Sequence, residues 1–330
     1  MSVLSCDRAR MLGVVAVVIS HAIATAQAQP SYPVKPVRII SGFAPGGFNN
    51  SSARLIAQKL GDALGQQFIV DNRPGANGLI ASDITAKSTP DGYTLFMTSA
   101  GLTTNPMLYT EMQRDPLKEF SAVSLFAAIP NVLVVHPLVP ARTMKELLAI
   151  ARAKPNTLTL ASSGVGAPGH LTAELLQQIT HARFVHIPYR GTGPALIDLI
   201  GGHVDLSFPT IATVIPHVQS GKLRALGITS AKRSPLLASV PTIGEGGVPG
   251  YEVVGWHGIV GPAGIPKDVV ARLSSEIGRM VKSPDVREIL LREGADPIGN
   301  TPEEFSVFLA EDLRKWTKVI KSANIRPSHI

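Results

Sequence analysis

The chain has 330 residues, of which 45% are hydrophobic and 17% are charged, so it can bury a sizeable core and is not intrinsically disordered. The net charge is +7, but the basic residues are dispersed and aromatic residues make up only 5%, which argues against a nucleic-acid-binding protein. The net charge instead predicts a positive surface potential, which favours the binding of anionic small molecules. The length exceeds one ordinary domain and suits two.

Residues 1–28 have the composition of a secretory signal peptide. Basic residues precede an apolar segment, Met11–Ile19, which is too short to span a membrane. A small-residue cleavage site ends at Ala28 or, alternatively, at Ala26. The single cysteine, Cys6, would leave with this segment, so the mature chain has no disulfide and no thiol chemistry. We therefore expect an exported protein of a bacterial periplasm.

The stretch Ser41–Ser52 lies between an apolar run, Val37–Ile40, and a helix-like run, Ala53–Leu64, and it contains no charged side chain. A strand that turns through glycines into a helix exposes unpaired N–H groups at the positive end of the helix dipole. Gly46 and Gly47 let a ligand approach the backbone closely. The stretch therefore suits an anion, although an ordinary strand-to-helix turn has the same pattern.

After this turn, short apolar runs alternate with amphipathic ones, which predicts a βαβαβ unit with parallel strands and right-handed crossovers. Such sheets bind ligands beyond the carboxyl ends of their strands, where Ser99 would lie. The expected strands are Val37–Ser41, Phe68–Asn72 and Thr94–Ser99, and the expected helices are Ser52–Leu64 and Leu79–Ser88.

A second α/β lobe is expected after the long apolar stretch Phe120–His136, which Pro130 and Asn131 interrupt. Thr143 followed by Glu146 is a capping box that starts a helix. The pattern of strand, small-residue turn and helix then recurs at 162–169. The other expected strands are Phe184–Tyr189, Val204–Pro209 and Leu223–Ser230, and the expected helices are Thr143–Ala153, Leu171–Thr180, Ala195–Gly201 and Ile211–Ser220.

The chain is expected to return to the first lobe through Tyr251–Gly261, after which it is mostly helical. Two crossings predict a discontinuous first lobe, residues 29–130 plus 253–330, and a second lobe, residues 131–252. The uncharged turns of the two lobes would face each other across a cleft. Asp205 and Trp256 are expected to be hinge or structural residues.

The spacing of Gly164, Gly166 and Gly169 matches the dinucleotide fingerprint G-x-G-x-x-G, but the next strand lacks the acidic residue that would bind a ribose. No histidines have metal-ligand spacing, and the turns lack an acid, base and nucleophile set, so we expect no metal, no cofactor and no enzyme activity. His170 is the one histidine expected near a ligand. Backbone donors and hydroxyl groups suit a carboxylate instead, and these hydroxyls belong to Ser41, Ser99, Thr103, Ser162, Ser163 and Thr210.

A series of short motifs follows in one order along the chain, including Phe43-Ala44-Pro45-Gly46-Gly47, Asn72-Arg73-Pro74-Gly75-Ala76, Ala161-Ser162-Ser163-Gly164, Pro188-Tyr189-Arg190-Gly191 and Gly202-His203-Val204-Asp205. In these motifs the chain resembles the Bug family of extracytoplasmic solute receptors, which serve tripartite tricarboxylate transporters. The resemblance implies a two-lobed type II periplasmic-binding-protein fold. Each lobe would be a mainly parallel sheet flanked by helices, with the ligand in the interlobe cleft.

The resemblance also implies that the turns Phe43–Gly47 and Ser162–Gly166 each hold one carboxylate of the ligand. One departure is Asn50, where the family usually has aspartate. Asparagine caps a helix about as well, but the lost charge leaves the ligand class open. The candidate ligand-binding residues are Phe43, Ala44, Pro45, Gly46, Gly47, Asn50, Ser99, Ser162, Ser163, Gly164, Gly166, His170 and Thr210.

The leading hypothesis is a periplasmic solute-binding protein for a di- or tricarboxylate, an acidic amino acid or an aromatic acid. Its partners would be the membrane subunits of a tripartite tricarboxylate transporter. The alternative is a receptor that presents the same ligand to a membrane histidine kinase, and a third hypothesis is an enzyme on the same fold. We expect a monomer.

Overall fold

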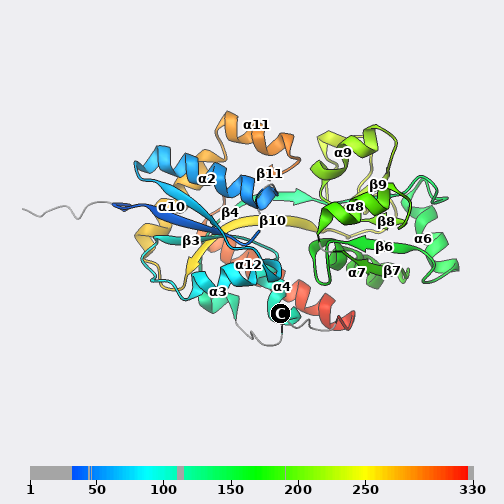
Figure 1. Ribbon diagram of the computed structural model, residues 1–330, viewed down its shortest axis with the longest axis horizontal. Coiled ribbons are helices and arrows are strands. Elements are labelled where there is room, and N and C mark those ends of the chain that lie inside the picture. The colour runs from blue at the N-terminus through cyan, green and yellow to red at the C-terminus, as the bar shows by residue number, and fades with distance from the viewer. Residues whose placement is uncertain (1–31, 44, 46, 110–114, 190, 326–330) are drawn as a thin grey trace, which may run out of the picture. The chain divides into compact units, whose positions relative to one another are not determined.

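Six strands form the sheet of the first lobe, in the spatial order β11-β4-β10-β3-β1-β2 (Figure 1). The computed structural model describes residues 32–43, 45, 47–109, 115–189 and 191–325, and the predicted signal peptide with Cys6 lies outside them. The residues from Lys35 onward form one compact unit, which holds every element named below. The strands are β1 (Val37–Ser41), β2 (Phe68–Asn72), β3 (Thr94–Ser99), β4 (Phe120–Pro130), β10 (Val254–Pro262) and β11 (Asp296–Pro297).

Five strands form the sheet of the second lobe, in the order β7-β6-β8-β5-β9. The chain enters this lobe at Asn131, directly after β4, and returns along β10 (Figure 1). The strands are β5 (Val132–Val135), β6 (Thr159–Ser162), β7 (Val185–Pro188), β8 (Leu206–Ser207) and β9 (Arg224–Ile228).

Both sheets are mixed, with a parallel and an antiparallel part. Strand β1 pairs in parallel with β2 and β3, as the βαβαβ pattern predicted, whereas β10 runs antiparallel to β3 and β4. Strand β6 is parallel to β7 and β8, and β5 is antiparallel to β8 and β9. The two-lobed α/β fold is confirmed. The sheets are less parallel than expected, because β10 arrives from the other lobe and so runs in the opposite direction.

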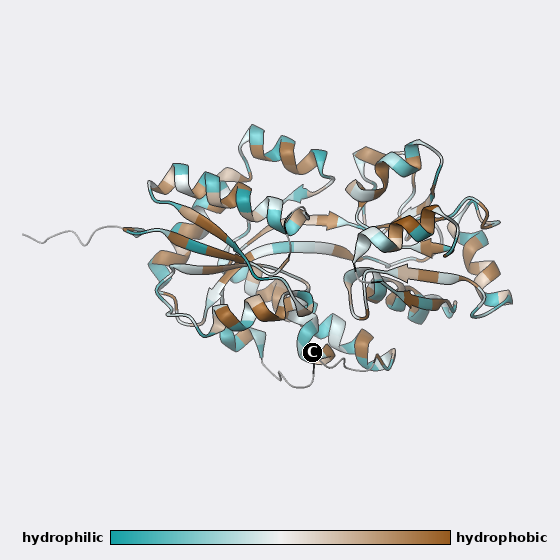
Figure 2. Cartoon of the chain, viewed as in Figure 1, coloured by the Kyte–Doolittle hydropathy of each residue, from teal (hydrophilic) through white to brown (hydrophobic). Residues whose placement is uncertain are grey.

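Helices flank both sheets, with α2 and α11 on one side of the first sheet and α3, α4 and α12 on the other (Figure 1). Teal and brown alternate along most of them, as expected for helices that bury one face (Figure 2). The predicted capping box is present, because Oγ1 of Thr143 accepts a hydrogen bond from the N–H of Glu146. The bounds are α2 (Phe48–Leu64), η1 (Ala76–Gly78), α3 (Leu79–Ala86), α4 (Gly101–Leu108), α5 (Pro116–Glu119), α6 (Met144–Ala153), α7 (Pro168–Thr180), α8 (Thr192–Ile200), α9 (Ile211–Gln219), η2 (Pro235–Leu237), α10 (Lys267–Met280), α11 (Pro284–Arg292) and α12 (Pro302–Ser322).

The last helix, α12, packs on the cores of both lobes. Its first half places Phe305 and Leu309 in the core of the first lobe, with Trp256 of β10. Its second half places Trp316 and Ile320 among the buried residues of the second lobe. The lobes are therefore linked by a shared helix as well as by the two strand crossings.

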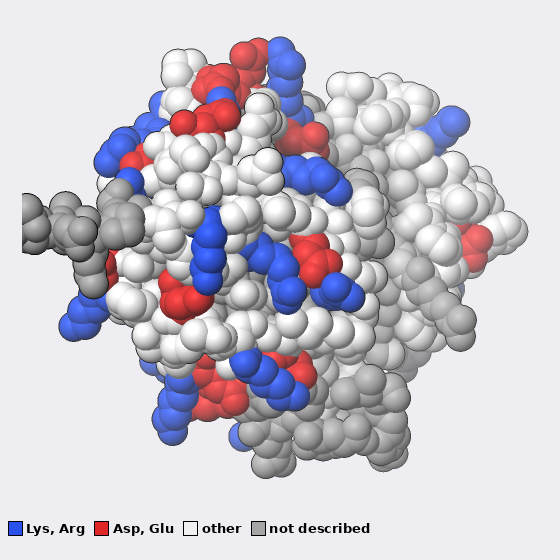
Figure 3. All heavy atoms as spheres, turned by 60° about the vertical axis from the view of Figure 1, so that its left-hand side comes forward, with Lys and Arg blue, Asp and Glu red and all other residues white. Residues whose placement is uncertain are grey.

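The surface in Figure 3 carries basic and acidic side chains interspersed, without a patch of one sign. The positive net charge is therefore not concentrated on that face. None of the helices in the described part of the chain is both long and apolar enough to cross a membrane.

Candidate functional site

A cavity of about 1150 Å³ is lined by residues of both lobes. Its walls come from the ends of strands and the starts of helices, as expected for sheets that bind ligands beyond their strand ends. Of the candidate residues, seven are in this wall: Phe43, Gly47, Ser99, Ser162, Ser163, Gly164 and Thr210.

The N-terminal caps of five helices lie in the cavity wall. They are Gly47 of α2, Ala100 of α4, Ala167 of α7, Gly191 of α8 and Thr210 of α9. None of the five makes a capping hydrogen bond with its side chain. Free N–H groups and five positive dipole ends therefore converge on one space, and each terminus stabilises a nearby anion by roughly 0.3–1 kcal/mol.

Among the described residues that line the cavity, none is Lys, Arg, Asp or Glu. Polar groups there are hydroxyls and amides, including Asn49, Asn131, Ser207 and Thr213, and the remaining wall is largely apolar and aromatic. Within the described ranges no group of three or more His, Cys, Asp or Glu side chains could hold a metal ion. The wall can donate hydrogen bonds to an anion without a balancing charge.

The first turn is held to the sheet by two asparagines. Nδ2 of Asn72 donates to the carbonyl oxygen of Phe43 at 2.8 Å. Oγ of Ser41 donates to Oδ1 of Asn49 at 2.9 Å, so this hydroxyl is buried behind the wall. Helix α2 starts at Phe48, earlier than the predicted Ser52, and that brings Asn49 into the wall. Ala44 and Gly46 lie outside the described residues.

Four candidate residues are described but are not among those that line the large cavity. Pro45 is exposed, and Asn50 is only 3% exposed, with its Oδ1 accepting a hydrogen bond from Nε of Arg54. Gly166 and His170 lie behind the second turn, where the N–H of Gly166 donates to Nδ1 of His170 at 3.0 Å. These four residues therefore lie outside the wall of the large cavity.

The second turn rests on a pair of stacked histidines. The rings of His170 and His186 are 3.7 Å apart between centroids and nearly parallel. Nε2 of His186 lies 2.6 Å from Oγ of Ser162, which also accepts a hydrogen bond from the N–H of Gly164. Burial, with a smaller contribution from His170, lowers the pKa of His186 to about 4. One histidine therefore supports each end of the turn.

The two predicted structural residues are both hydrogen-bonded. Oδ2 of Asp205 accepts hydrogen bonds from the N–H and Oγ1 of Thr159, each at 2.7 Å. Trp256 is 2% exposed, lines the cavity, and donates from Nε1 to Asp312 at 3.1 Å. Thr103, one of the predicted hydroxyl donors, is buried and donates to the same carboxylate.

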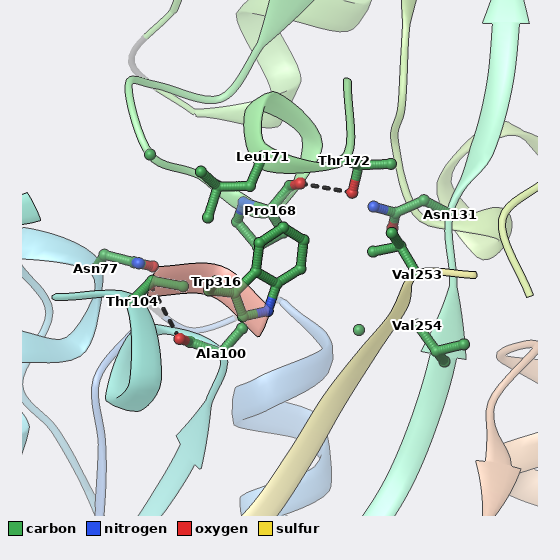
Figure 4. A pocket seen from close by; sticks show the side chains of 12 residues that line it. Asn77, Ala100, Thr104, Asn131, Pro168, Leu171, Thr172, Val253, Val254 and Trp316 are labelled. Carbon is green, nitrogen blue, oxygen red and sulfur yellow. Dashed lines mark hydrogen bonds between the residues drawn. The ribbon is translucent and has the colours of Figure 1, made fainter. Parts of the chain in front are cut away.

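A second, small cavity of about 20 Å³ lies where the lobes meet. In Figure 4 the indole of Trp316 lies between two sets of side chains: Pro168 and Leu171 of α7 on one side, and Ala100, the N-cap of α4, and Thr104 of α4 on the other. Its volume is about that of one water molecule. The small cavity is therefore a packing gap between the lobes and not a ligand site.

Gly166 contacts the first lobe directly. It has a φ of +72°, and a Cβ there would collide with Cδ1 of Leu108 at the end of α4. Replacing Gly166 with alanine is therefore expected to lower the free energy of unfolding by about 2 kcal/mol, measured by urea denaturation.

Gly47→Ala is the matched control for this variant. Gly47 has a φ of −91°, and nothing lies within 4 Å of the added Cβ. Its free energy of unfolding should stay within about 0.5 kcal/mol of the parent. Equal losses in the two variants would contradict the contact with Leu108.

Comparison with known proteins identifies the family. Residues 52–325 match the model of the tripartite tricarboxylate transporter family receptor. The chain belongs to this family. The receptor is 35% identical to BugT of Bordetella pertussis over 320 residues, which is 96% of this chain and 98% of BugT. The resemblance to the Bug family is thereby confirmed.

Solved structures agree with this assignment. The receptor is similar to R. palustris Rpa4515 with adipate, with a TM-score of 0.81, 35% identity and coverage of 90% of this chain and 100% of that chain. MatC (Rpa3494) from Rhodopseudomonas palustris with bound malate gives a TM-score of 0.76, 30% identity and coverage of 88% and 100%.

Proposed function

We propose that this chain is a periplasmic receptor that captures a small organic acid for a tripartite tricarboxylate transporter. The observation that carries the proposal is the convergence of five helix N-termini, none capped by a side chain, on one cavity. Each hydrogen bond to a carboxylate contributes about 1.5–3 kcal/mol. Four or five such bonds contribute about 6–15 kcal/mol together, and after an association cost of about 4 kcal/mol or more, the remainder is compatible with about 8 kcal/mol, a micromolar Kd.

The chemistry of the wall supports an acid with an apolar body. The turns that carry Gly47 and Gly164 stand on different lobes, so a ligand with two carboxylates would reach both. Phe48, Ile129 and Phe208 line the space between polar groups and suit methylene or ring carbons. The adipate and malate named for the similar structures belong to this class.

Thermal-shift measurements with mono-, di- and tricarboxylates and with aromatic acids test the proposal. At a ligand concentration a hundred times Kd, the folded state gains about 2.7 kcal/mol, which appears as a rise in Tm. A sugar and a divalent cation are the negative controls. A response to either of these, with none to any acid, would refute the proposal.

The membrane partner is a separate test. Co-purification from membranes should recover the transporter subunits. Recovery of a histidine kinase without transporter subunits would instead favour the alternative, a receptor that presents its ligand to that kinase.

We propose no catalytic role for Ser162 and His186, although their 2.6 Å contact resembles a nucleophile with its base. A histidine whose pKa is lowered to about 4 is a poor acceptor for a serine proton near pH 7. No hydrogen bond within the described part of the chain orients Nδ1 of His186. Turnover of an acyl ester that is lost in Ser162→Ala would overturn this statement.

A further inference from the structure

His257 lies in the cavity wall, although it was not among the residues predicted to bind the ligand. It belongs to β10 and pairs with Ser99 at the end of β3. The register of β10 against β4 shifts between His257 and Gly258, and such a bulge redirects the neighbouring side chain. The imidazole meets the ring of Phe48 edge to face, with 4.9 Å between centroids. The ring is thus fixed beside the first helix terminus.

The hydrogen bonds of Asn49 determine which nitrogen of His257 carries the proton. Nδ2 of Asn49 donates to the carbonyl oxygen of Met97 at 3.1 Å, and a carbonyl can only accept, so the orientation of this amide is fixed. Oδ1 on its other side accepts from Ser41. The same Nδ2 lies 3.2 Å from Nδ1 of His257, which must therefore be the acceptor. The proton of the neutral ring is on Nε2.

Nε2 of His257 is available to a ligand. The hydrogen bonds of the described residues include none to this atom, and it is not among the buried nitrogens without a partner. Burial lowers the pKa of His257 to about 4, so the ring is neutral at pH 7. The cavity therefore holds a fixed, uncharged N–H donor beside Gly47 and Phe48.

We propose that His257 donates a hydrogen bond from Nε2 to an oxygen of the bound acid and thereby selects acids without an amino group. An ammonium group beside this donor would face N–H groups and the positive ends of helix dipoles, and no carboxylate of the described wall would balance its charge. Among the described wall residues there is no Asp or Glu to receive it. The inference rests on the proposed function and removes acidic amino acids from its ligand class.

Two pairs of acids of equal length test the selection by isothermal titration calorimetry. Succinate is compared with L-aspartate, and adipate with L-2-aminoadipate. The wild type should bind at least one acid more tightly than its amino counterpart, by about tenfold or more. Equal affinity within each pair would overturn the selection.

The variants His257→Asn and His257→Gln distinguish the role of Nδ1, which contacts Asn49, from that of Nε2, which would contact the ligand. Asparagine places its amide near Nδ1 and keeps the contact with Asn49, whereas glutamine reaches the position of Nε2. Asn should weaken binding of the preferred acid about tenfold or more, and Gln should restore part of that loss. Long-range ¹⁵N NMR of the wild type should show the tautomer protonated at Nε2. The unliganded Tm of each variant reports on folding separately.

The outcomes distinguish the two proposals. If no acid in the thermal-shift panel binds the wild type, the proposed function fails and this inference fails with it. If acids bind but His257→Asn binds them as tightly as the wild type does, only the role of His257 is refuted. A tautomer protonated at Nδ1 would refute it too.

Discussion

Replacing Asp312 with alanine is expected to lower the free energy of unfolding by about 4 kcal/mol. Oδ1 of this carboxylate accepts a hydrogen bond from Nε1 of Trp316 at 3.0 Å, and Oδ2 accepts from Nε1 of Trp256 at 3.1 Å and from Oγ1 of Thr103 at 2.6 Å. The threonine hydroxyl has a second acceptor in the carbonyl of Ala100, but the indoles have none among the described residues. Two buried donors left unpaired cost about 1–3 kcal/mol each.

Asp312→Asn is the matched control, because it keeps one oxygen and the shape of the side chain. The retained oxygen can accept the hydrogen bonds from Trp256 and Thr103. The new NH₂ group would then face the N–H of Trp316, so that two donors oppose each other. We expect about half the loss of the alanine variant, measured by urea denaturation. Asp312→Asn combined with Trp316→Phe should cost less than the sum of the two single losses, since the conflicting donor is then gone. An Asp312→Ala loss below about 1 kcal/mol would contradict the arrangement.

Acidification from pH 7 to pH 5 is expected to lower the free energy of unfolding by about 4 kcal/mol through two histidines. Burial, with a smaller contribution from the neighbouring His170, lowers the pKa of His186 to about 4, and burial lowers the pKa of His257 to about 4. In the unfolded chain the pKa of each is about 6.5. The unfolded chain therefore binds protons between pH 6.5 and 4 that the folded chain does not.

The free energy of unfolding therefore falls as the pH falls through this range. The stability from these two groups is complete above pH 6.5 and is lost as the pH falls toward 4, with about 2 kcal/mol lost per histidine at pH 5. His186→Gln should remove about half of the pH dependence in this interval. Carboxylates with lowered pKa, such as Asp285 and Glu245, lose their contribution mainly below pH 5. Burial raises the pKa of Asp312, so the contribution of this carboxyl changes in the opposite direction as the pH falls. The decisive comparison is therefore with His186→Gln, and a variant with the same pH dependence as the wild type would contradict the burial of this imidazole.

The elements predicted correctly are those with local signals. β1, β2 and β3 were predicted with their observed bounds because each is a short apolar run closed by turn residues. The start of α6 followed from its capping box. Helix α4 was missed because it contains Pro106, which normally interrupts a helix, and its packing against α12 outweighs that cost.

Residues of the cavity wall were predicted where they follow one another along the chain and were missed where the wall depends on pairing between distant segments. The two turns could be read from glycine and serine spacing. His257 enters the wall only through the pairing of β10 with β3, which joins segments far apart in the sequence. The side chains of Asn49 and Asn50 point in different directions because both belong to α2, in which consecutive side chains are about 100° apart. Asn49 faces the strands and Asn50 lies beside Arg54.

The shared carboxylate of Asp312 has a practical consequence. The chain contains two tryptophans, and both donate to this one side chain. Trp256 lines the large cavity and Trp316 lines the gap between the lobes. Tryptophan fluorescence therefore arises entirely between the large cavity and the contact of the lobes, and no distant indole adds to the signal. Binding of unlabelled acids can therefore be measured by the change in tryptophan emission. The Trp316→Phe variant leaves only the emission of Trp256 at the large cavity, and so separates it from emission at the lobe contact.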